Sequence, residues 1–137
     1  MPNHFHLHVR PKNTDVIPRL MKQLSNAYTK YFNTRYERVG GLFQGRYKTG
    51  EIENDEQNIH LHRYILINPL VSCLAESLEE YPWTSFYRKN VSRLNELCND
   101  EEFRSRFSSL EDYKKFIYDQ VDYSKSLHEL KNLVVED

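Results

Sequence analysis

The chain has 137 residues, of which 39% are hydrophobic and 28% are charged, and its formal net charge is −1. This length is typical of a single domain that buries its own core, and no apolar run is long enough to predict a membrane-spanning helix. The two cysteines, Cys73 and Cys98, lack the spacing of metal ligands, and no basic-then-apolar signal segment leads the chain, so we expect a cytoplasmic protein with reduced thiols.

The first predicted element in chain order is a strand over residues 4–9, where the sequence HFHLHV alternates histidine with apolar residues. Successive side chains of a strand point to opposite faces, so the three histidines share one face and the apolar side chains share the other. The imidazoles of a His-x-His pair then lie about 7 Å apart along the strand, which suits two ligands of one divalent ion. For this motif alone, partly exposed surface histidines are the favoured interpretation.

Capping and turn signals predict the next elements. Residues 13–15 offer a helix cap, and apolar residues with helical spacing predict a helix that continues to Phe32. Gly40 and Gly41 indicate a turn, and the sequence after them predicts one or two short strands over residues 42–53.

A second helix is predicted to begin at a capping pair, Asn54 and Gln57, and to continue to about Ile67. Asn68 and Pro69 are expected to end it, because proline disfavours helical geometry in the residue before it.

Four side chains of this second helix could carry chemistry. His60 and His62 are two residues apart, so they diverge by about 200° around the helix and are not expected to chelate one ion. Tyr64 and Asn68 are four residues apart and share a face. For this pair alone, a core tyrosine beside a helix-ending asparagine is the favoured interpretation.

The last third of the chain is predicted to be helical. Residues 79–86 indicate a turn that leads into a short helix, and the chain from Asp100 onward has an amphipathic helical pattern. Its apolar anchors are Phe103, Phe107, Tyr113, Phe116 and Ile117.

Three stretches, MPNHFHLHV, GLFQGRYKTG and RYILINPLVSCLAESLEEYPWTSF, occur in this order along the chain. Together they resemble the REP-associated branch of the single-tyrosine HUH transposases, which is related to the insertion-sequence transposases that move single-stranded DNA. HUH denotes histidine, bulky hydrophobe, histidine, and His4-Phe5-His6 matches it. The resemblance covers residues 1–90 densely and continues more loosely through FSSLEDYKKFIYDQVD.

This resemblance implies a metal-dependent endonuclease and strand transferase that acts on single-stranded or hairpin DNA. Tyr64 matches the family nucleophile, which forms a 5′-phosphotyrosine and frees a 3′-OH. His4, His6 and Asn68 match the metal ligands, and this mixed set suits Mg²⁺ or Mn²⁺. His8 stands where relatives usually carry an aliphatic residue, and we expect it to be rim surface.

DNA contacts are expected from the basic first half of the chain. Residues 1–50 carry nine lysines and arginines against two acids, a net charge of +7, whereas residues 51–137 carry ten basic and eighteen acidic residues, a net charge of −8. A chain polarised in this way can present a basic face to phosphates, although a solvated helix face with an acidic tail explains the asymmetry equally well. The candidates for contact with phosphates or bases are Arg10, Lys12, Arg19, Lys22, Phe43, Arg46, Tyr47 and Lys48. For Trp83, core packing is favoured over stacking on a base.

We therefore predict an α+β fold, in which an antiparallel sheet bears the histidine pair and helices pack on it. The resemblance implies a catalytic domain over residues 1–90, and a helical C-terminal extension follows over residues 91–137. Family members usually carry several dozen residues before the MPNH segment, which supply a strand and a helix. A sheet without that strand exposes an edge that favours pairing with a second copy as a homodimer.

Two other functions are considered. One alternative is a truncated or domesticated relative that binds structured single-stranded DNA without cutting it. A His-x-His metal hydrolase is disfavoured, because the barrel that usually carries such a site needs about 250 residues.

Overall fold

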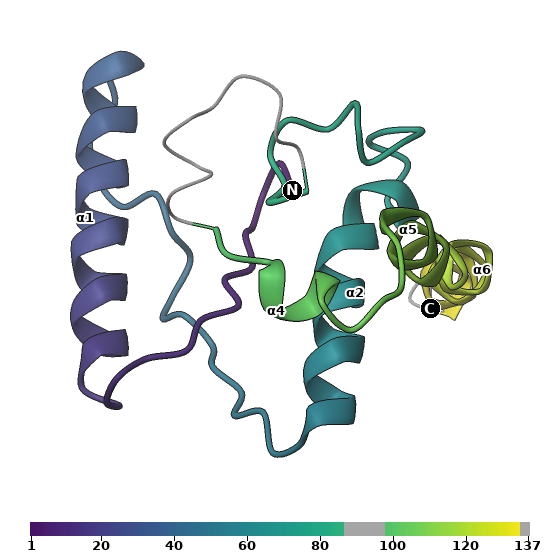
Figure 1. Cartoon of the computed structure of the whole chain (residues 1–137). Coiled ribbons are helices and arrows are strands. Elements are labelled where there is room, and N and C mark those ends of the chain that lie inside the picture. The colour runs from purple at the N-terminus through teal and green to yellow at the C-terminus, as the bar shows by residue number, and fades with distance from the viewer. Residues whose placement is uncertain (87–97, 135–137) are drawn as a thin grey trace. The chain divides into compact units, whose positions relative to one another are not determined.

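The computed structural model describes residues 1–86 and 98–134. The helices within these ranges are α1 (Val16–Arg35), α2 (Asp55–Val71), α4 (Glu101–Arg104), α5 (Leu110–Tyr118) and α6 (Val121–Val134) (Figure 1). The chain divides into two compact units. The first comprises Met1–His6 together with Ile52–Asp137, and the second comprises Leu7–Glu51.

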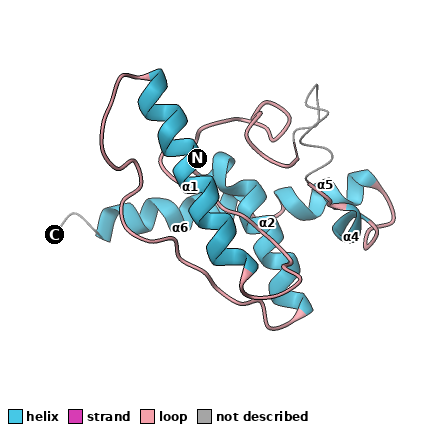
Figure 2. Ribbon diagram, turned by 90° about the vertical axis from the view of Figure 1, so that its left-hand side faces the viewer, coloured by secondary structure: helices cyan, strands magenta, loops and turns pink. Residues whose placement is uncertain are grey.

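The predicted antiparallel sheet is wrong, because the described part of the chain contains helices and loops but no strand (Figure 2). Residues 4–9 and 42–53, where strands were expected, are loops and bends. Within residues 1–86 and 98–134, the alternation at residues 4–9 has no partner strand to satisfy its backbone groups. Its apolar face is also poorly buried, since Phe5, Leu7 and Val9 are 43–48% exposed. The sheet edge that suggested a homodimer is therefore absent from these residues, and dimerisation itself stays a prediction.

The second unit is built on α1, which confirms the helix predicted after residues 13–15. Asp15 is the N-cap, but its side chain makes no capping hydrogen bond, and the chain enters the helix through weak backbone bonds. Met21 is the buried apolar residue of α1, while Leu20, Leu24 and Tyr28 are 37–47% exposed. The helical spacing thus predicted the element correctly, although little of its apolar stripe is covered.

The start of α2 confirms the predicted capping pair. The N–H of Gln57 donates to Asn54 Oδ1 at 2.8 Å, and the N–H of Glu53 donates to Gln57 Oε1 at 2.8 Å. This reciprocal pair satisfies backbone donors that the first turn of a helix leaves unbonded.

The predicted end of α2 is wrong, because the helix runs through Pro69 and ends at Val71. Proline in a helix removes one backbone hydrogen bond. Continuation of the helix buries Leu70, whose side chain is 2% exposed, and this burial offsets the lost bond. The helix then ends in a turn at Cys73, whose φ is +52°.

The core of the first unit lies between α2 and the C-terminal helices (Figure 1). Here the predicted helical pattern after Asp100 is confirmed, because α4, α5 and α6 supply apolar anchors to one buried cluster. The buried members of this cluster are Leu66, Ile67, Leu70, Leu78, Phe86, Phe103, Tyr113, Ile117 and Val121. Consequently α2 is packed along one side by chain that lies more than thirty residues further on.

Two further expectations concern regions at the limit of this description. The helix expected after residues 79–86, and the domain boundary expected after residue 90, lie outside the described residues. Among the helices that are described, none is both long and apolar enough to cross a membrane.

Candidate functional site

The two histidines of the HUH motif lie beside Tyr64 within the first unit. The ring centroids of His4 and His6 are 5.1 Å apart, and the planes are nearly perpendicular at 88°. The ring centroid of His6 is 5.9 Å from that of Tyr64, again edge to face. These three predicted site residues are therefore brought together even though no strand carries the histidines.

The His6 imidazole can offer an unprotonated nitrogen at neutral pH. Partial burial lowers the pKa of His6, and the neighbouring His4 lowers it further. His4 Nδ1 lies 2.7 Å from Asn3 Oδ1. An amide oxygen accepts hydrogen bonds, so a proton on His4 Nδ1 can be donated to it. Neutral imidazole nitrogens of this kind are the form that binds metal ions.

Asn68 lies one turn after Tyr64 on α2. Tyr64 is 52% exposed, whereas the side-chain Nδ2 atom of Asn68 is buried and has no hydrogen-bond partner among the described residues. An unpaired buried amide costs free energy, and the two ends of an amide are interchangeable by rotation about χ2. The role of Asn68 as the third ligand, which the resemblance implies, stays a prediction.

The donor types around this site constrain what it could bind. No group of three or more histidine, cysteine, aspartate or glutamate side chains in the described ranges could hold a metal ion. A site built on the predicted residues would consist of two imidazoles and one amide oxygen. Such a set leaves coordination positions open for substrate oxygens and water.

His60 and His62 contact different partners on α2, as their spacing predicts. His60 Nδ1 accepts from Arg63 Nη2 at 2.8 Å. His62 points into the core, where its Nε2 is 2.7 Å from Tyr113 Oη and its ring stacks on Phe103 at 3.8 Å between centroids.

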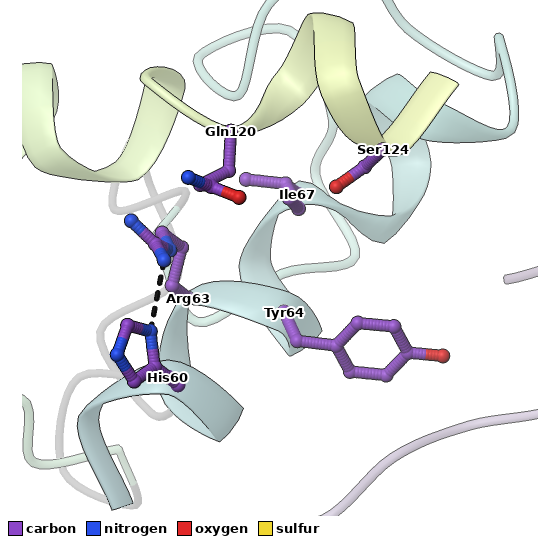
Figure 3. A pocket seen from close by; sticks show the side chains of 6 residues that line it. All are labelled: His60, Arg63, Tyr64, Ile67, Gln120 and Ser124. Atoms are coloured by element: carbon purple, nitrogen blue, oxygen red, sulfur yellow. Dashed lines mark hydrogen bonds between the residues drawn. The ribbon is translucent and has the colours of Figure 1, made fainter. Parts of the chain in front are cut away.

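Arg63 is a candidate functional residue that the sequence analysis missed. It immediately precedes Tyr64, it is 9% exposed, and its guanidinium lies 4.4 Å from the centre of the Phe116 ring. A pocket of about 180 Å³ opens beside it, lined by His60, Arg63, Tyr64, Ile67, Gln120 and Ser124 (Figure 3). The signal in the sequence was an arginine on a helix that is otherwise rich in apolar residues, but its surroundings come from residues more than fifty positions away.

The eight residues predicted to contact DNA all belong to the second unit and all are exposed. Exposed side chains can reach phosphates and bases. The role of these eight residues in DNA binding stays a prediction. His8 also belongs to the second unit, whereas His4 and His6 belong to the first, and it is half-buried. The core packing expected for Trp83 is wrong, since this side chain is 82% exposed.

Comparison with known families gives one match. The family model described as "Transposase IS200 like" matches residues 1–68, a segment that includes His4, His6, Tyr64 and Asn68. This match supports the transposase family for this part of the chain, without distinguishing the REP-associated branch. Searches of curated proteins and of solved structures found no significant match.

Proposed function

Starting from the match of residues 1–68 to IS200-like transposases, we propose that this chain cleaves and rejoins single-stranded DNA through Tyr64, as a member of the REP-associated branch. The observation that carries the proposal is the 5.9 Å approach of the His6 ring to the Tyr64 ring, with His4 a further 5.1 Å from His6. An exposed phenol next to two imidazoles is the combination that metal-assisted phosphodiester cleavage needs.

Tyr64 acts as the nucleophile in the proposed reaction. Its Oη attacks the phosphorus of a phosphodiester, a bond forms between Oη and phosphorus, and the bond from phosphorus to the 3′ oxygen breaks. The phenol loses its proton and the departing 3′ oxygen gains one, so a free 3′-OH and a 5′-phosphotyrosine result. A second 3′-OH can then attack this phosphotyrosine: a bond forms between its oxygen and phosphorus, the bond from phosphorus to Tyr64 Oη breaks, and the phenol regains a proton. One phosphate ester replaces another at each step, so strands are rejoined without a nucleotide cofactor.

His4, His6 and Asn68 are the residues that would hold a divalent ion, Mg²⁺ or Mn²⁺. When bound, the ion supplies Lewis-acid polarisation of a non-bridging phosphate oxygen. The chain's own contribution is orientation. Asn3 Oδ1 lies 2.7 Å from His4 Nδ1, and Asn68 follows Tyr64 by one turn of α2.

DNA is expected to be held by the basic residues of the second unit. Their side chains are exposed, and flexible cationic side chains suit a backbone that is bound without sequence readout. A single-stranded or hairpin substrate is proposed because exposed aromatic rings, Phe43 and Tyr47, accompany the arginines and lysines.

The test is formation of a covalent adduct. Full-length protein is incubated with single-stranded hairpin DNA and Mn²⁺, and the products are separated on a denaturing gel. We expect a protein–DNA band that is lost in Tyr64→Phe and kept in Tyr31→Phe, which changes a tyrosine of similar exposure, 61% against 52%. An adduct that persists in Tyr64→Phe would refute the assignment of the nucleophile. Absence of an adduct from wild type, with DNA binding retained, would favour the relative that binds without cutting.

A further inference from the structure

Arg63 is a cation held inside the protein by neutral partners. Its Nη2 donates to His60 Nδ1 at 2.8 Å, and its Nη1 donates to the backbone oxygen of Phe116 at 3.3 Å. One face of the guanidinium covers the Phe116 ring. No ion pair within 4.0 Å joins Arg63 to a carboxylate in the described part of the chain. Because a guanidinium carries five N–H donors, three remain for another acceptor.

The electrostatics of Arg63 favour an anion nearby. Burial lowers the pKa of Arg63, and the negative charge of Asp119 opposes this effect without forming an ion pair. Arginine nevertheless stays protonated in proteins, so the Arg63 guanidinium carries its positive charge in a partly desolvated environment. Removing a charge from water costs free energy unless a counter-charge compensates it. A negatively charged ligand would provide that compensation.

The pocket beside Arg63 has the size and the donors for such a ligand. Its volume of about 180 Å³ is more than ten times the roughly 10–15 Å³ that a cavity needs to hold one water molecule. Gln120 and Ser124, at the start of α6, face it from the side opposite His60 (Figure 3). Among the described residues, no hydrogen bond occupies the side chains of Gln120 or Ser124. The pocket thus combines a guanidinium with an amide and a hydroxyl, which are typical phosphate ligands.

We propose that this pocket binds a phosphodiester of the DNA strand, next to the one that Tyr64 attacks. The inference rests on the proposed function for the identity of the strand. Tyr64 lines the pocket, but its ring points away from Arg63 (Figure 3). The phosphate in the pocket is therefore distinct from the phosphate at the phenol. By this arrangement, α6 supplies part of a substrate site outside the segment that matches the transposase family.

The first arm of the test uses inorganic phosphate as the probe. The Nε–H resonance of Arg63 is followed by NMR in the full-length protein at constant ionic strength, and it is assigned by its absence from Arg63→Lys. We expect a saturable shift in wild type, and an affinity about five-fold weaker in Ser124→Ala, the loss expected for one hydrogen bond of about 1 kcal/mol. Ser126→Ala is the matched control on the same helix, because the Ser126 hydroxyl bonds to Asp122 O at 3.1 Å, outside the pocket.

Asp119→Asn provides a second variant with the opposite expectation. Removing its negative charge should tighten phosphate binding several-fold, because Asp119 now opposes an anion near Arg63. If Asp119 were the natural counter-charge of Arg63, this variant would instead lose thermal stability and gain no affinity, and that result would overturn the proposal.

The second arm uses a short single-stranded oligonucleotide with the Tyr64→Phe protein, in which no adduct is expected to form. The proposal requires that the oligonucleotide shift the Arg63 resonance, compete with phosphate, and bind more weakly to Tyr64→Phe/Ser124→Ala. Phosphate binding without competition would identify a free-phosphate site and overturn it, as would a resonance that responds to neither probe. The adduct gel separates the two hypotheses. If the adduct forms but neither probe shifts the Arg63 resonance, only this inference is refuted. If the probes shift the Arg63 resonance but no adduct forms, only the cleavage reaction is refuted.

Discussion

Replacement of Cys73 with glycine is expected to stabilise the protein, because Cys73 holds a backbone conformation that favours glycine. Its φ is +52°, and it follows the last turn of α2. The N–H of Leu74 donates to Pro69 O at 2.8 Å, and the N–H of Cys73 donates to Leu70 O at 3.1 Å. This is the hydrogen-bond pattern of a Schellman motif, in which the left-handed residue is most often glycine.

The magnitude follows from two opposing effects. The left-handed conformation costs an L-residue about 1–2 kcal/mol, and glycine removes this strain. Glycine also raises the entropy of the unfolded chain, which lowers the free energy of unfolding by roughly 0.5–1 kcal/mol. The thiol of Cys73 is exposed, so its removal exposes little apolar surface. We therefore expect the free energy of unfolding to rise by about 0.5–1 kcal/mol.

Urea denaturation of wild type and variant measures this difference directly. Cys73→Ala is the matched control, because it removes the thiol and keeps the Cβ atom that causes the strain. The reasoning would be refuted if Cys73→Gly were less stable than wild type, or if Cys73→Ala gained as much stability as Cys73→Gly.

Three further predictions concern pH, salt and metal. The hydrogen bond from Arg106 lowers the pKa of Asp55 in the folded state, so this carboxylate stabilises the protein above its unfolded pKa and loses the effect as pH falls through the folded pKa. Asp55→Asn should accordingly flatten the acid side of a plot of thermal stability against pH, and an unchanged slope would contradict it. Arg46→Gln should weaken binding to unrelated single strands uniformly and reduce the salt slope by about 1, as measured by fluorescence anisotropy at several salt concentrations. His6→Ala should abolish most Mn²⁺ binding in calorimetry while His8→Ala keeps it, and equal losses in both variants would place the HUH motif in the wrong register.

Local signals in the sequence predicted local structure well. Asn54 and Gln57 are three residues apart, so their capping bonds form wherever the helix forms. The apolar pattern around Tyr113 and Ile117 likewise predicted a buried helix face, because helical periodicity is a property of the segment itself.

The expectations that failed depend on distant partners. A strand at residues 4–9 needs a neighbouring strand, and the alternation of side chains does not supply one. Pro69 was expected to end α2 because of its local geometry, but the burial of Leu70 among residues of α5 and α6 outweighs that preference. Tertiary burial in this way overrides a local signal of a few kcal/mol.

The candidate site was predicted in part, for the same reason. His4, His6 and Tyr64 were identified from the sequence through a family resemblance, and the structure brings their rings together. Arg63 was not identified, because an arginine beside a tyrosine has no distinctive pattern. Its significance comes from Phe116, Gln120 and Ser124, more than fifty residues later in the chain.

The packing of α2 against the C-terminal helices limits how this protein could be shortened or recombined. Leu66, Ile67 and Leu70 of α2 are each 2% exposed because residues after 100 cover them. A fragment cut after residue 90 would keep Tyr64 and the HUH motif but present this apolar surface to water, and we expect it to aggregate or to be degraded. We therefore expect that a gene fusion which keeps α2 folded must include the C-terminal helices.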